Sequence, residues 1–259
     1  MTTTPLQTDT DYIETRNADG TVRFGLPVVS LGFPPPPAGY KVAWQKLFST
    51  YASVSAFLAD FYSWAANPAS SSPWTIWDQA MLRIDATGLH GHAQSEANGM
   101  VRTFGFGRKV GYVPPTIVRV HCRRPAFAGL KRNDGIFWAT DGKEPQEAEI
   151  DSAEDDGTAT SLDINIHLGQ TWPSLVGSAH LGGIRTDLWG TMEMRVTPTG
   201  AKTTWTPDRG SSSSVSLARA LPATSHTCDI QVEALRQGLA LPGTGLDFDF
   251  DWWQELVPA

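Results

Sequence analysis

Short strand-like runs separated by turn residues are the feature that most constrains the fold of this chain. Eleven runs follow one another, and Gly, Pro, Asn or Asp stands in most of the gaps. They are AMLRID, GLHGHAQ, GMVRTF, TIVRVHC, GIFWAT, AEIDSA, LDINIHL, TMEMRVT, AKTTWT, CDIQVEAL and LDFDFDWW. Because no helical period alternates with them, they predict an all-β protein built as an antiparallel two-sheet sandwich or jelly roll.

The N-terminal segment has a different character. YIETRNADGTVRFGL places two strand-like runs around Asp19 and Gly20, which favour a tight turn, so it predicts a β-hairpin. Four consecutive prolines, Pro34 to Pro37, follow it and favour an extended spacer. We therefore expect an N-terminal arm over residues 1–37 and one main domain over residues 38–259. The alternative is a hairpin that adds an edge to the main sheets.

One short helix is expected between Ser53 and Trp64. Apolar residues there partly follow three- and four-residue spacing, and a serine is available to cap the first turn.

Charge and hydropathy exclude several classes of partner. The net charge is −7 and no basic cluster is present, which argues against nucleic acid. No stretch approaches the roughly 20 apolar residues of a membrane span, and the first residues lack the pattern of a cleaved signal peptide. Only Cys122 and Cys228 are present, which excludes a disulfide framework and leaves a single bridge open.

The segment EAEIDSAED concentrates acidic residues, and three of them, Glu149, Asp151 and Glu154, stand at near alternate spacing. Ionised carboxylates are costly to bury without partners, so this segment is either a solvated edge or the floor of a catalytic site. Alternation along a strand places Glu149 and Asp151 on one face and Glu154 on the other. A β-bulge near Ser152 and Ala153 would return Glu154 to the first face, and all three carboxylates would then lie together.

Such a group suits glycoside hydrolysis. A retaining mechanism needs one ionised carboxylate that attacks the anomeric carbon and a second, protonated one that donates to the leaving oxygen, roughly 5 to 5.5 Å away. An ionised Glu149 beside Asp151 would raise the proton affinity of Glu154, which leaves one base and one acid in the same place.

The segment EIDSAE resembles the bulged active-site signature of glycoside hydrolase family 16, which lies on a strand of a concanavalin-like jelly roll. Its pattern is Glu, an aliphatic residue, Asp, two further residues and Glu. The flanking segments are similar to those of the family in order, over roughly residues 41 to 256: NGMVRTFGFG, IVRVHCRRP, GIFWAT, INIHLG, WGTMEMRVTPTGAKTTW and FDFDWW.

The resemblance implies a role for each carboxylate. Glu149 would be the nucleophile, Glu154 the acid/base, and Asp151 the group that orients and tunes them. The chain departs from the family pattern at Ile117, where an acidic residue is usual. It also departs between Asp151 and Glu154, where hydrophobic residues are usual and this chain has Ser and Ala.

The resemblance also implies contacts with a bound sugar. Trp138 would lie under the sugar, and Arg119 and His167 would make polar contacts with it. Further tryptophans are expected either in the core or as sugar-stacking platforms, with Trp172 kept as a candidate contact. They are Trp172, Trp189 and Trp205.

Metal sites have weaker support in the sequence. Family 16 members often hold a structural calcium through an Asp on the last strand, and Asp251 matches that position best, although calcium needs six or more oxygens. No other cofactor is expected. His90 and His92 share a strand face and suit a metal, but no third ligand is apparent, so polar groups on the surface or in the cleft are the main expectation.

The expected activity is that of a retaining endo-β-glycosidase acting on a β-linked glucan or galactan, with polysaccharide as the partner. The alternative is a non-catalytic carbohydrate-binding or structural jelly roll. A phage minor tail protein that contacts host surface glycans is one example, because a virion tail would suit an N-terminal arm that docks in a larger assembly.

Overall fold

The computed structural model describes residues 15–16, 22–23, 32–66, 72–139, 148–168 and 175–259, with side chains undescribed for 15–16, 22–23 and 133–139. The chain divides into two compact units, Met1–Pro35 and Pro36–Ala259. In the first unit, β1 (Thr15–Arg16) pairs with β2 (Val22–Arg23) in antiparallel register, as the predicted hairpin requires. The predicted boundary at residue 37 and the independence of the arm stay predictions.

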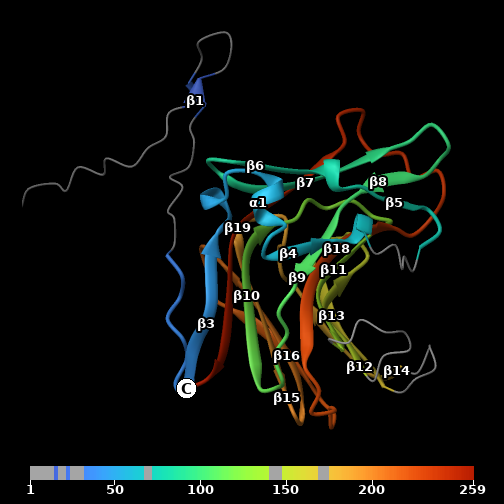
Figure 1. Cartoon of the computed structure of the whole chain (residues 1–259). Helices are drawn as coiled ribbons and strands as arrows, with labels where there is room; N and C mark the ends of the chain where they lie inside the picture. Colours follow the sequence, from blue (N-terminus) through green and yellow to red (C-terminus); the bar gives the residue numbers. More distant parts are fainter. Residues whose placement is uncertain (1–14, 17–21, 24–31, 67–71, 140–147, 169–174) are drawn as a thin grey trace, which may run out of the picture. The chain divides into compact units, whose positions relative to one another are not determined.

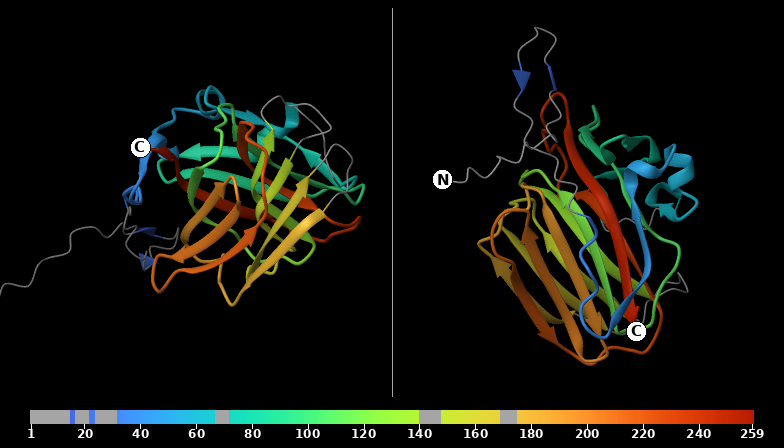
Figure 2. Two further views of the ribbon diagram at one scale, coloured as in Figure 1. Left: turned by 90° about the horizontal axis from the view of Figure 1, so that it is seen from below. Right: turned by 90° about the vertical axis from the view of Figure 1, so that its left-hand side faces the viewer.

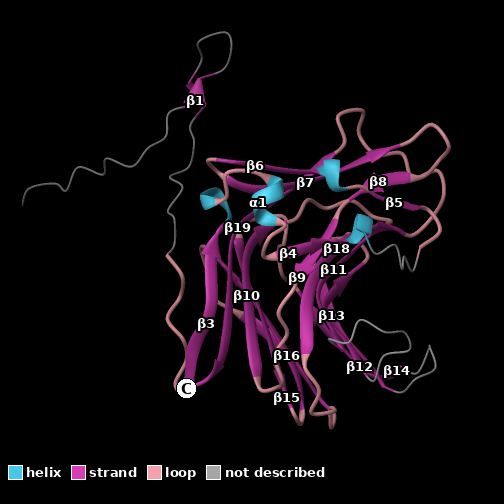
Figure 3. Cartoon of the chain, in the orientation of Figure 1, coloured by secondary structure: helices cyan, strands magenta, loops and turns pink. Residues whose placement is uncertain are grey.

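Nearly every described element of the second unit is a strand (Figures 1 and 3). Among the described residues, one sheet has ten strands. Its main path runs β17 (Ser213–Ala218), β16 (Gly200–Pro207), β15 (Gly190–Thr197), β10 (Thr116–Arg123), β19 (Leu246–Pro258), β7 (Gly88–Ser95), β8 (Val101–Thr103) and β5 (Thr75–Trp77), with β3 (Tyr40–Leu47) on β19 and β6 (Leu82–Asp85) on β7.

The second sheet has seven strands in the described part of the chain. They follow in the order β14 (Leu175–Gly182), β13 (Ser161–Leu168), β12 (Ala148–Asp155), β11 (Leu130–Ala139), β18 (His226–Ala234), β9 (Gly105–Arg108) and β4 (Phe61–Ser63). Every pairing in this sheet is antiparallel. The β12 segment that concentrates carboxylates is therefore an interior strand.

The two sheets pack face to face around one hydrophobic core (Figure 2). Alternate residues supply it, such as Val118 and Val120 from β10 and Ile164 and Ile166 from β13. Such alternation is what a strand with one buried face requires. The all-β two-sheet jelly roll predicted from the sequence is confirmed, and each of the eleven predicted runs overlaps a strand.

The helix expected between Ser53 and Trp64 is wrong beyond its first turn. Ser53 caps α1, which spans only Val54–Phe57. The chain then extends as β4 and pairs with β9, and the ring of Phe61 stacks on that of Phe57 with centroids 4.4 Å apart. Burial of this aromatic pair between the sheets therefore overrides the helical spacing.

In the described part of the chain, the remaining helical segments are single 3-10 turns: η1 (Phe48–Thr50), η2 (Trp64–Ala66) and η3 (Gln79–Met81). No described helix has the length and apolar character needed to cross a membrane.

A buried ion-pair network fixes the carboxyl end of β12. Asp155 Oδ1 accepts a hydrogen bond from Arg132 Nε at 2.8 Å, and Oδ2 accepts one from Arg124 Nη2 at 3.0 Å. All three side chains have no solvent exposure. The amide of Gly157 also donates to Oδ1, at 2.7 Å, so the turn after the strand depends on the same carboxylate.

Asp155→Asn is expected to lower the free energy of unfolding by about 3 to 5 kcal/mol, because it removes the negative charge that two buried guanidinium groups contact. Urea unfolding followed by tryptophan fluorescence measures this loss. Asp156→Asn is the matched control, since that neighbouring side chain is exposed and should change stability by no more than about 0.5 kcal/mol. Equal losses in the two variants would contradict this role of Asp155.

Candidate active site

A β-bulge in β12 brings the three carboxylates to one face. Glu149 pairs with His167 and Asp151 with Asn165, whereas Glu154 pairs with Asp163. Two residues, 152 and 153, therefore separate the last two pairs on β12, while only residue 164 separates them on β13. The extra residue lies where the sequence predicts it, and the predicted bulge is confirmed.

The side chains between the carboxylates show which face this is. Ile150 and Ala153 belong to the hydrophobic core and are fully buried. Alternation around the bulge therefore directs Glu149, Asp151 and Glu154 to the opposite face of the seven-stranded sheet, away from the core. We call this surface of β11, β12, β13 and β18 the carboxylate face.

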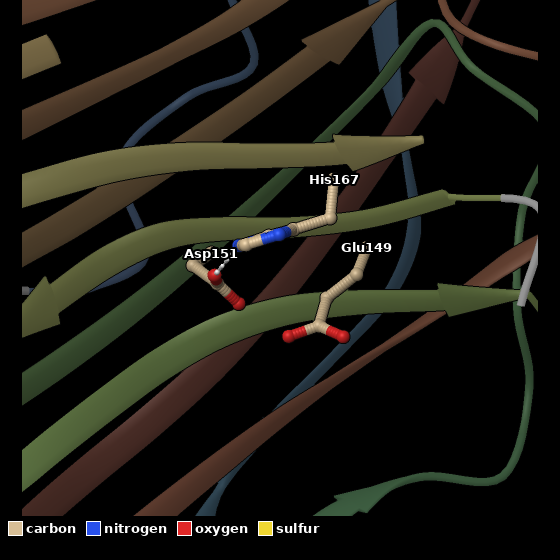
Figure 4. A group of neighbouring side chains, drawn as sticks. All are labelled: Glu149, Asp151 and His167. Atoms are coloured by element: carbon tan, nitrogen blue, oxygen red, sulfur yellow. Dashed lines mark ion pairs between the residues drawn. The ribbon is translucent and has the colours of Figure 1, made fainter. Parts of the chain in front are cut away.

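His167 joins the carboxylates from the neighbouring strand (Figure 4). Its Nε2 lies 3.4 Å from Asp151 Oδ2, and a ligand atom from each of Glu149, Asp151 and His167 lies within 4.8 Å of the other two. Two oxygens and one imidazole nitrogen at this spacing are a donor set that a metal ion can use. The same arrangement lets the imidazole orient Asp151 without any metal.

Burial and like charge make Glu149 harder to ionise. Burial and then the charge of Asp151, with a hydrogen bond between the two carboxyl groups, raise the pKa of Glu149 to about 9. Two carboxylates this close resist ionising together, so the pair keeps one shared proton over the neutral range. Whichever oxygen holds that proton, the partner carboxylate is left with the negative charge.

Glu154 has a different set of neighbours. Its Oε1 forms an ion pair with Lys131 Nζ, and its Oε2 accepts a hydrogen bond from Asn165 Nδ2 at 2.6 Å. Burial and then the charge of Asp151 raise the pKa of Glu154, while Lys131 and Asn165 act in the opposite direction. Glu154 therefore shares the influence of Asp151 with Glu149 but has its own contacts with Lys131 and Asn165.

A second polar group lies further along the same sheet. The fully buried Asp229 of β18 accepts hydrogen bonds from Trp64 Nε1 at 2.8 Å and Tyr62 Oη at 3.1 Å. Both rings cross β9 at glycines: an added Cβ at Gly105 would meet the indole at 2.7 Å, and one at Gly107 would meet the phenol ring at 2.4 Å. The charge of Asp229 also contributes to the raised pKa of Glu149, after burial and Asp151.

Sequence reasoning missed several of these polar groups. Alternation in LDINIHL puts Asn165 on the face of His167, and alternation in CDIQVEAL puts Asp229 opposite the buried Ile230, so both were detectable. Lys131 precedes the run GIFWAT, outside every predicted strand, and only the register of β11 against β12 reveals it.

The structure does not bring Arg119 to the carboxylates. Its strand, β10, belongs to the ten-stranded sheet, and the core residues Val118 and Val120 flank it, so its side chain lies on the outer face. There Nε donates to Glu193 Oε2 at 2.8 Å and Nη1 donates to Gln254 Oε1 at 3.1 Å. The sequence predicts that Arg119 lies on a strand, but it does not predict which of the two sheets contains that strand.

The four candidate tryptophans have different outcomes. Trp138 lies in β11, opposite Thr227 of β18, but its side chain is outside the described part, and Trp172 lies outside the described residues altogether. Their sugar contacts stay predictions. Trp205 is buried in the core, and the half-buried Trp189 stacks on a histidine ring rather than beside the carboxylates.

Asp251 lies on the outer face of the ten-stranded sheet beside His121. The ring of His121 bridges two carboxylates, with Nδ1 3.1 Å from Asp251 Oδ2 and Nε2 3.0 Å from Asp208 Oδ1. Although burial lowers its pKa, these two hydrogen bonds raise the pKa of His121 to about 9. Calcium takes six or more oxygen ligands, and an imidazolium does not fit such a site. Calcium at Asp251 stays a prediction.

His90 and His92 pair with carboxylates of the last strand. His90 Nδ1 lies 2.8 Å from Asp249 Oδ1, and His92 Nδ1 lies 2.8 Å from Asp247 Oδ1. These pairs between β7 and β19 match the expectation of polar groups on the surface.

Several solved structures are similar to most of this chain. An endo-1,3-β-glucanase from Streptomyces sioyaensis has a TM-score of 0.63 and 14% identity, covering 87% of this chain and 99% of that one. A non-specific endo-β-1,3(4)-glucanase of family 16 has a TM-score of 0.68 and 13% identity, covering 86% and 93%. β-Agarase A from Zobellia galactanivorans has a TM-score of 0.61 and 14% identity, covering 89% and 98%.

No family model and no curated protein sequence matches the chain. At identities this low, a structural likeness speaks for the fold. The second unit, with its bulged strand of carboxylates, therefore has the jelly-roll fold found in the glycoside hydrolase family 16 enzymes.

Proposed function

We propose that this protein is a retaining endo-β-glycosidase that cleaves a β-linked glucan or galactan. The observation that carries the proposal is the bulge in β12, which directs Glu154 to the face that Glu149 and Asp151 occupy. The solved structures with this fold support it, because they are named as endo-glucanases and an agarase.

In the first step, a carboxylate oxygen of Glu149 attacks the anomeric carbon while the bond to the leaving oxygen breaks. The carboxyl of Glu154 gives its proton to that oxygen. Attack requires an ionised Glu149, so the shared proton must lie on Asp151 at that moment. His167, 3.4 Å from Asp151, helps to hold that carboxyl in place.

In the second step, water attacks the anomeric carbon of the glycosyl ester and the bond to Glu149 breaks. The carboxylate of Glu154 takes a proton from the water and returns to its starting state. Two displacements at the same carbon retain its configuration.

The rival function is glycan binding without cleavage, for example by a phage tail protein on a host surface. The contact between Lys131 and Glu154 favours it, because an ammonium stabilises the ionised form of a group that must donate a proton. A polysaccharide is the partner in either case.

A panel of β-glucans and β-galactans separates the two functions. The hydrolase should release new reducing ends from at least one of them, with fragment lengths typical of internal cleavage. Binding is measured on the same panel by a glycan array. Tight binding of a glycan with no new reducing ends from any polymer would contradict the hydrolase and leave the binding module.

A further inference from the structure

Lys131 lies between two carboxylates on the carboxylate face. It belongs to β11, whose neighbours are β12 and β18. Its Nζ forms an ion pair with Glu154 Oε1 and lies 3.7 Å from Glu233 Oε1. The Lys131 and Glu154 side chains are only 24% and 17% exposed, so water screens this pair less than a pair on an open surface.

The two oxygens of Glu154 are held from opposite strands. Lys131 on β11 contacts Oε1, and Asn165 on β13 donates to Oε2 at 2.6 Å. With both oxygens held, the plane of the carboxyl group is fixed relative to Glu149 and Asp151. An acid/base needs such a fixed direction, because proton transfer depends on geometry before it depends on proton affinity.

The charges facing Glu154 come from its own strand, from the two neighbouring strands and from β18 beyond β11. Asp151 lies on its own strand, and Asp163 stands opposite on β13, paired with His180 at 2.7 Å. The remaining groups are Glu233 of β18 and Lys131 of β11. Among these groups, Lys131 is the cation that touches Glu154.

We propose that Lys131 is a positioning residue for Glu154, which holds the direction of its carboxyl and sets the pH at which that carboxyl releases its proton. This inference rests on the proposed function, in which Glu154 works first as an acid and then as a base.

The two steps of the reaction make opposite demands on Glu154. The first requires a proton on the carboxyl, and the second requires its absence. Burial and the charge of Asp151 raise the pKa of Glu154, and the ammonium of Lys131 limits that rise. Lys131 thus supports the second step, because its ammonium stabilises the carboxylate that the first step leaves on Glu154.

Removal of the ammonium should therefore raise the pKa of Glu154. In Lys131→Met, the basic limb of the profile of kcat/KM against pH should move up by about one pH unit, a typical shift for the loss of one adjacent charge. Lys131→Arg keeps the charge and should restore most of the original profile. Lys202→Met, on the outer strand pair of the other sheet, is the control and should leave the limb in place.

A second measurement separates this inference from the proposed function. The carboxyl of Glu154 is titrated by NMR in protein labelled with carbon-13 at glutamate side chains, with Glu154→Gln to assign the signal. Its midpoint should move up in Lys131→Met and also in Lys131→Gln, which serves if the first variant folds poorly. Far-ultraviolet circular dichroism checks the fold of each variant.

The outcomes distinguish two kinds of failure. If the parent protein cleaves no glycan but the midpoint still shifts, the hydrolase proposal fails and only the effect of Lys131 on the pKa of Glu154 stands. If the midpoint in folded Lys131→Met or Lys131→Gln equals that of the parent, the inference is overturned whether or not the protein cleaves glycans. A basic limb that moves equally in Lys202→Met would also overturn it.

Discussion

Glu149→Gln is expected to lower the turnover of a cleavable glycan by about four orders of magnitude, because an amide of the same shape has no anionic oxygen to attack the anomeric carbon. Glycan affinity should persist, since the side chain keeps its size and its place on β12. Turnover is measured from reducing ends and affinity by calorimetry with an oligosaccharide that the parent protein cleaves.

The control for this variant is Glu193→Gln. Glu193 lies on the other sheet and pairs with Arg119, so the same change of charge should leave turnover close to that of the parent. Parental turnover in Glu149→Gln would remove Glu149 as the nucleophile. Loss of affinity as the main effect would favour the binding module.

Glu154→Ala is expected to lower cleavage of polysaccharide by about two to four orders of magnitude, the usual contribution of a general acid or base. Aryl glycosides with good leaving groups need little protonation, so their first step should be slowed far less. Added azide should then occupy the space of the lost carboxyl, attack the glycosyl ester, and yield a glycosyl azide that retains the anomeric configuration.

The stereochemistry of the azide product identifies which glutamate has been removed. Glu149→Ala lacks the group that forms the ester, so azide should not give a product of retained configuration in that variant. Proton NMR of the anomeric position reads the result. If azide neither speeds Glu154→Ala nor forms a product with it, Glu154 is not the acid/base.

The sequence predicts the carboxylate face well because the pattern that defines this face lies within one short segment of the chain. Alternation along one strand fixes which residues share a face, and three carboxylates at this spacing require one extra residue between Asp151 and Glu154. The register of β12 against β13 confirms that residue. His167 follows from the same parity, since it stands opposite Glu149 on the next strand.

The residues that escape prediction depend on contacts between distant segments. Lys131 reaches Glu154 only because β11 lies beside β12, and the order of strands in a sheet is not written in the period of any one strand. Arg119 shows the same limit. Alternation along its strand predicts which residues share a face with it, but it does not predict which of the two sheets the strand joins. The helix after Ser53 failed because the stacking of Phe57 and Phe61 is a tertiary contact.

The bulge also constrains how such a protein can change during evolution. Insertion of a single codon beside Ser152 or Ala153 would shift the alternation by one residue and turn Glu154 toward the core. The same shift would carry Asp155 away from Arg124 and Arg132, so the fold would suffer together with the chemistry.

Substitution of one glutamate has no such effect on the backbone. A lineage that abandons cleavage and keeps glycan binding should therefore lose a carboxylate by point substitution while the length of this strand stays unchanged. Among proteins descended from this domain, the number of residues in β12 should therefore be conserved more widely than Glu149, Asp151 and Glu154 themselves.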